Sequence, residues 1–113
     1  MKQITTMTLE EKVGQLICGR FGWDTAERDL AEGRVGSLYG VLGDMESPAA
    51  VAELCNHLQS VAAVPALFVG EQEQGSHRML PRGTQFPSYM ATGATRSPEL
   101  AYEFGRVCAA EAR

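Results

Sequence analysis

The pattern of hydrophobic and polar residues predicts three helices in this chain. The first occupies residues 8–19, because Thr8 and Glu11 have the spacing of a capping box and apolar residues then recur at helical intervals before a glycine. The second (47–63) and the third (from residue 97 onward) each begin with Ser-Pro, which supplies a cap and a proline suited to the first helical position. The third helix carries an apolar face of Leu100, Phe104, Val107 and Cys108.

Two short apolar runs, residues 35–42 and 66–69, predict strands. The second run has no polar residue, which is typical of a strand buried on both faces. Residues 20–33 predict a surface connection holding a single helical turn, and the polar residues 70–87 predict a long loop. Strands that alternate with helices predict an α/β fold with parallel strands.

The number of predicted strands also bears on the organisation of the chain. Two strands are too few for a parallel sheet, whose strands need neighbours on both sides. The sequence also ends within the third predicted helix, without a glycine cap or a following strand. We therefore expect residues 1–113 to be the front part of a longer fold.

Composition narrows the classes of function. The chain has 113 residues, of which 44% are hydrophobic and 21% charged, with a formal net charge of -4. This composition is typical of a globular protein, and its scattered basic residues do not favour nucleic-acid binding. The odd set of Cys18, Cys55 and Cys108 predicts core thiols in a reducing compartment. With neither a secretory signal nor a membrane-spanning run in this sequence, we expect a cytoplasmic protein.

The densest group of polar residues lies in the predicted loop, directly after the strand at 66–69. Ligands of α/β folds bind at the carboxyl ends of parallel strands. Glu71 and Glu73 can accept hydrogen bonds from hydroxyl groups, and Arg78 can donate them, a combination that suits a sugar. The simpler alternative is a solvated loop without a ligand. His77 has no partner at ligand spacing, so we expect no metal site.

Five stretches of sequence carry a further pattern. They are, in chain order, residues 7–16, 35–40, 65–73, 83–95 and 97–106. Together they resemble glycoside hydrolase family 3 at the N-terminal end of its catalytic barrel, more closely the β-N-acetylhexosaminidase branch than the β-glucosidases. The resemblance implies an incomplete (β/α)₈ TIM-type barrel, with an N-terminal helix and the first two βα units, truncated before the third strand.

The resemblance also implies an activity. Family members are exo-acting, retaining glycosidases, and this branch hydrolyses terminal β-linked N-acetylglucosamine without a cofactor or metal. The Asp nucleophile of family members and the His-Asp acid/base pair of the hexosaminidase branch lie later in the barrel. No catalytic residue is therefore assigned here, and the fragment alone should be inactive. Two alternatives stay open: a β-glucosidase of the same family, and a non-catalytic fragment that binds sugar or self-associates through exposed strand edges.

Two substrate-binding residues follow from the family's motif after the second strand, which reads roughly D-Q-E-G-G-R-V-Q-R. Glu71 stands at the position of the first Asp, which binds hydroxyls of the non-reducing sugar. Ser76 replaces the first arginine. The second arginine, a sugar ligand in the hexosaminidase branch, aligns with Met79, and Arg78 precedes it by one residue. The resemblance thus implies that Glu71 and Arg78 contact the substrate.

Overall fold

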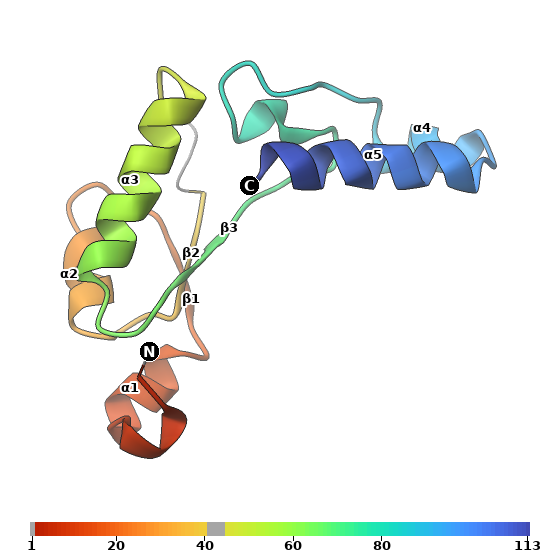
Figure 1. Cartoon of the computed structure of the whole chain (residues 1–113). Helices are drawn as coiled ribbons and strands as arrows, with labels where there is room; N and C mark the ends of the chain where they lie inside the picture. Colours follow the sequence, from red (N-terminus) through yellow and green to blue (C-terminus); the bar gives the residue numbers. More distant parts are fainter. Residues whose placement is uncertain (1, 41–44) are drawn as a thin grey trace. The chain divides into compact units, whose positions relative to one another are not determined.

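The computed structural model describes residues 2–40 and 45–113, which form two compact units (Figure 1). The described residues of the first, here called the sheet unit, are 2–40 and 49–70. Those of the second, the loop unit, are 45–48 and 71–113. Within the small domain that the sequence predicts, the loop unit thus joins residues 45–48 to the residues that follow Gly70.

The sheet unit contains three parallel strands in the order β1-β2-β3. They are β1 (Cys18–Arg20), β2 (Ser37–Tyr39) and β3 (Leu67–Val69). Gly19, Leu38 and Phe68 are partners across the middle of the sheet. The predicted α/β class with parallel strands is therefore confirmed, and the open three-stranded sheet is consistent with part of a barrel.

The first strand was not predicted, and the expectation of only two strands is wrong by one. The sequence predicts residues 18 and 19 at the end of the first helix and residue 20 in the surface connection, but helix α1 (Leu9–Gly14) ends earlier. After α1 the chain turns, and the carbonyl of Ile17 accepts a hydrogen bond from Gly36 N at 3.1 Å, which aligns β1 with β2. A three-residue strand is too short to show an alternating pattern, so pairing with β2 defines it rather than its own sequence.

Helices α2 (Ala26–Ala31) and α3 (Pro48–Val61) cover one side of the three strands (Figure 1). The α3 helix confirms the second predicted helix, whereas α2 lies where a connection with one turn was expected. Leu38 from β2, Leu30 from α2 and Leu58 from α3 are all at most 2% exposed. These apolar side chains form the core of the sheet unit.

The other face of the sheet is open. Leu67 and Val69 of β3 are 71% and 41% exposed, so the expectation of a strand buried on both faces is wrong. Cys18 of β1 is in register with this face and is exposed, whereas Cys55 is partly buried and Cys108 buried. The prediction of three core thiols therefore holds fully only for Cys108.

The loop unit contains two helices and a short 3-10 turn: α4 (Tyr89–Ala94), α5 (Pro98–Glu111) and η2 (Ser76–Arg78). The α5 helix confirms the third predicted helix, and its cap Ser97 accepts a hydrogen bond from Leu100 N. The α4 helix was not predicted. Phe104 of α5 packs against Phe86 and Tyr89, with ring centroids 4.7 and 5.2 Å away.

The predicted capping box at the N-terminus is also present. The Thr8 side chain accepts from Glu11 N, and the Glu11 carboxylate accepts from Thr8 N at 2.9 Å. Lys2 forms an ion pair with Glu11 at 2.5 Å. A short helix, η1 (Ile4–Thr6), precedes α1.

Candidate functional site

Glu71 follows the carboxyl end of β3, separated from it by Gly70. Its side chain is exposed. The carboxyl ends of parallel strands are the edge at which α/β folds bind ligands, and a carboxylate there has lone pairs to offer to hydroxyl donors. The local chain path therefore agrees with the position that the sequence analysis gave to this residue.

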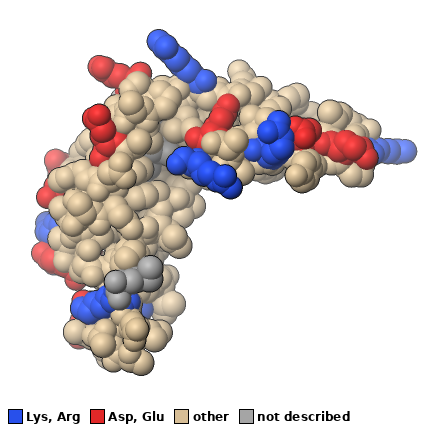
Figure 2. Space-filling view, viewed as in Figure 1, with Lys and Arg blue, Asp and Glu red and all other residues tan. Residues whose placement is uncertain are grey.

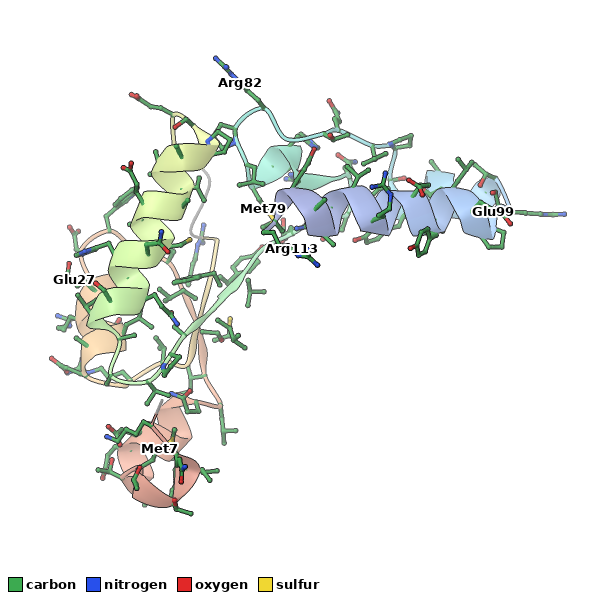
Figure 3. The ribbon with its side chains drawn as sticks, viewed as in Figure 1. Met7, Glu27, Met79, Arg82, Glu99 and Arg113 are labelled. Carbon is green, nitrogen blue, oxygen red and sulfur yellow. The ribbon has the colours of Figure 1, made fainter. Side chains whose placement is uncertain are left out.

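Arg78 is the last residue of η2, and its side chain is also exposed. Met79, the residue aligned with the motif's arginine, is half-buried and caps this turn. The loop therefore exposes the guanidinium of Arg78 and partly shields the thioether. A second exposed arginine, Arg82, has a left-handed backbone (φ 64) and points away from the loop (Figure 3).

Glu111, at the end of α5, accepts hydrogen bonds from two residues of this loop, Ser76 and Thr84. One carboxylate oxygen accepts hydrogen bonds from the Ser76 hydroxyl and from Thr84 N, the latter at 3.0 Å. The other oxygen accepts from the Thr84 hydroxyl. Hydrogen bonds from Ser76, then from the side chain and backbone of Thr84, lower the pKa of Glu111 below its ordinary value. The carboxylate is thus held in its charged form.

Two glycines let the two limbs of the loop, residues 74–76 and residues 83–86, pass close to each other. Gly75 has a left-handed backbone (φ 89), and a Cβ at this position would lie 2.2 Å from the carbonyl oxygen of Thr84. A Cβ on Gly83 would lie 2.8 Å from the backbone carbon and hydroxyl oxygen of Ser76. The segment from residue 74 to residue 86 is thereby a compact loop, closed by a 2.8 Å hydrogen bond from Phe86 N to Gln74 O.

A hollow of about 510 Å³ lies between α4, α5 and Gln72 in the loop unit. Aromatic and small side chains line it, among them Tyr89, Phe104 and Cys108. Burial is the main cause that raises the pKa of the Cys108 thiol, so this thiol stays protonated and is no nucleophile near neutral pH. The hollow therefore offers a mainly apolar surface with the side-chain amide of Gln72 and the hydroxyls of Tyr89 and Thr92.

The three residues that order the loop, Ser76, Thr84 and Glu111, were missed by the sequence analysis. A signal was present, because Glu111 continues the helical spacing of the buried Phe104 and Cys108. A carboxylate on the apolar face of a helix needs donors, and the loop supplies them.

Each of the two histidines lies beside a polar partner within its own unit. His57 of α3 lies 3.2 Å from Glu27 of α2, and His77 Nδ1 lies 3.0 Å from Gln74 O. Within residues 2–40 and 45–113, no three His, Cys, Asp or Glu side chains come together as metal ligands. On the face shown in Figure 2, acidic and basic side chains are interspersed, unlike the basic patch of a nucleic-acid-binding protein.

None of the helices among the described residues is long and apolar enough to cross a membrane.

Comparison with known proteins identifies the family to which this chain belongs. No curated protein matches the chain. Residues 8–113 match the glycosyl hydrolase family 3 N-terminal domain. The match spans β1, β2 and β3 and the loop that bears Glu71 and Arg78. The chain belongs to glycosyl hydrolase family 3.

Proposed function

We propose that this chain supplies a sugar-contacting loop to an exo-acting, retaining β-N-acetylglucosaminidase. Membership of the family implies a relation to glycoside hydrolases and, in general, a carbohydrate substrate. The observation that supports the finer proposal is the exposure of Glu71 and Arg78 on one loop after a parallel strand. An acceptor and a forked donor together can read the vicinal hydroxyls of a terminal sugar.

The roles we propose are those of ligands and do not include the chemical step. Glu71 accepts hydrogen bonds from hydroxyls of the non-reducing sugar, and Arg78 donates hydrogen bonds to the same sugar. The nucleophile that forms the glycosyl-enzyme and the group that protonates the leaving oxygen are not assigned to this chain. We therefore expect the 113-residue chain alone to show no turnover of an aryl N-acetyl-β-glucosaminide.

The test uses the product of the complete reading frame that encodes this chain. Its rates on aryl N-acetyl-β-glucosaminide and aryl β-glucoside are compared, and then measured again for Glu71→Gln. Loss of one charged hydrogen bond to the sugar should lower kcat/KM by about tenfold. The matched control is Glu53→Gln, which replaces an exposed carboxylate on α3 and should leave kcat/KM unchanged.

The outcomes separate the alternatives. A faster rate on the glucoside would make the protein a β-glucosidase and overturn the proposed specificity. An unchanged kcat/KM for Glu71→Gln would remove this residue from the substrate site. Turnover by the 113-residue chain alone would show that the nucleophile and the acid/base group lie within this chain, which contradicts the proposal.

A second candidate function is self-association as a non-catalytic module, and the open sheet face favours it. Leu67 and Val69 expose apolar surface on a parallel sheet, a type of sheet that is usually covered on both faces. Light scattering on the chain should then give a defined dimer that Leu67→Ser dissociates. A monomer at high concentration would contradict this candidate.

A further inference from the structure

The carboxylate of Glu111 lies at the end of its helix where a negative charge does not stabilise the helix. It is the last residue of α5, and the carbonyl groups at the end of a helix carry partial negative charge. The side chain nevertheless continues the face that carries Phe104 and Cys108, both buried. Its position therefore needs a reason outside the helix, and the hydrogen bonds it accepts come from the loop.

The bonds to Glu111 reach both limbs of the loop. Ser76 begins η2, whose last residue is Arg78, and Thr84 lies on the returning limb after Arg82. One oxygen of Glu111 accepts from both limbs, and the other accepts from the Thr84 hydroxyl. A single carboxylate therefore ties together the two ends of the segment that carries both exposed arginines.

Water cannot easily replace this carboxylate. Ser76 is 0% exposed, so its hydroxyl has no access to solvent. A buried hydroxyl without an acceptor is costly, and the loop would have to open to hydrate it. Gly75 and Gly83 leave no free space in which the limbs could settle closer together.

We infer that Glu111 is a positioning residue for sugar binding: by accepting from Ser76 and Thr84 it fixes the loop that presents Arg78. This inference rests on the proposed function, because it assumes that the loop contacts sugar. It assigns no contact with the substrate to Glu111 itself.

The experiment measures loop order and sugar binding separately in the 113-residue chain. Loop order is read from hydrogen exchange of the Thr84 amide and from relaxation of the Arg78 Nε–Hε group. Sugar binding is read by NMR titration with N-acetylglucosamine. In Glu111→Ala we expect Thr84 exchange to accelerate at least about tenfold. The affinity for the sugar should fall by about tenfold, because the guanidinium is no longer held in place.

Two further variants keep the test decisive. Glu111→Gln retains one acceptor oxygen and should recover part of both properties, which a general loss of folding would not allow. Glu103→Gln is the matched control on the same helix, because Glu103 is exposed and pairs only with Arg106 among the contacts described, at 2.8 Å. Leu38 signals in the sheet unit report whether each variant is folded.

The possible failures are distinguishable. Unchanged Thr84 exchange in Glu111→Ala overturns the positioning role. Faster exchange with unchanged sugar affinity also overturns it, because the order of the loop then does not matter for binding. A wild-type chain that binds no sugar overturns the proposed function and the sugar-binding part of this inference, while Thr84 exchange still decides whether Glu111 orders the loop.

Discussion

The sheet unit and the loop unit of this chain are ordered by different forces. In the sheet unit, buried leucines from β2, α2 and α3 meet in one apolar core. The loop unit has few buried apolar side chains, and its loop is ordered by a carboxylate that accepts from Ser76 and Thr84. The comparison teaches that apolar burial orders the sheet unit, whereas the loop after β3 depends on a few polar contacts.

The largest effect should come from the apolar core. Leu38 is 1% exposed at the centre of the sheet, so Leu38→Ala should lower the free energy of unfolding of the sheet unit by about 2–5 kcal/mol through lost burial and a cavity. Urea denaturation followed by amide exchange in β2 and at Thr84 measures this loss. Protection at Thr84 should persist, and an equal loss in both units would contradict their separation.

A smaller effect is expected where the loop needs glycine. Gly75→Ala introduces a Cβ 2.2 Å from the Thr84 carbonyl oxygen at a left-handed backbone position. This should destabilise the loop unit by about 1–3 kcal/mol, measured by exchange at Thr84. Gly93→Ala in α4 is the matched control, since nothing lies within 4 Å of its Cβ, and helix propensity should make it neutral or slightly stabilising. If Gly75→Ala and Gly93→Ala changed the stability of the loop unit by similar amounts, the close contact at Gly75 would not be the cause.

Acid should loosen the loop unit through Glu111. The bonds from Ser76 and Thr84 lower its pKa, so the stabilisation is present above the ordinary pKa of 4.5 and is lost as pH falls through the lower folded value. Cys108, which also interacts with this carboxylate, is neutral throughout that range. We expect Thr84 exchange, corrected for its intrinsic pH dependence, to lose protection below about pH 4.5. Glu111→Gln should abolish this pH dependence, and a variant that keeps it would assign the titration to another group.

The smallest effect should come from the surface of the sheet unit. His57 and Glu27 link α3 to α2 at 3.2 Å, but their side chains are 54% and 61% exposed. A double-mutant cycle with His57→Gln and Glu27→Gln should give a coupling of at most about 0.5 kcal/mol, because water screens the pair. A coupling as large as the loss in Leu38→Ala would show that polar contacts also order the sheet unit.

The helices show how much of the fold could be predicted from sequence. Thr8 and Ser97 marked helix starts correctly, because a capping side chain satisfies backbone groups within its own first turn. The β1 strand was missed because only pairing with β2 defines its three residues. The α4 helix was missed although Ser88 caps it, since its sequence lacks an apolar period.

The candidate site could be predicted only in part, for a similar reason. Glu71 and Arg78 could be named because a family motif is a local pattern along the chain. Glu111 could not be linked to Ser76, because the two lie 35 positions apart and only the folded loop brings them together. The helical spacing marks Glu111 as a residue of the apolar face, but it does not indicate which distant residues donate to it.

The most direct test of the central claim, that this loop contacts sugar, is a titration of the labelled chain with N-acetylglucosamine. The account predicts saturable NMR shifts at the Glu71 amide and the Arg78 Nε–Hε group, with little change in α3. Shifts restricted to other parts of the chain, or no saturable shift at all, would contradict it.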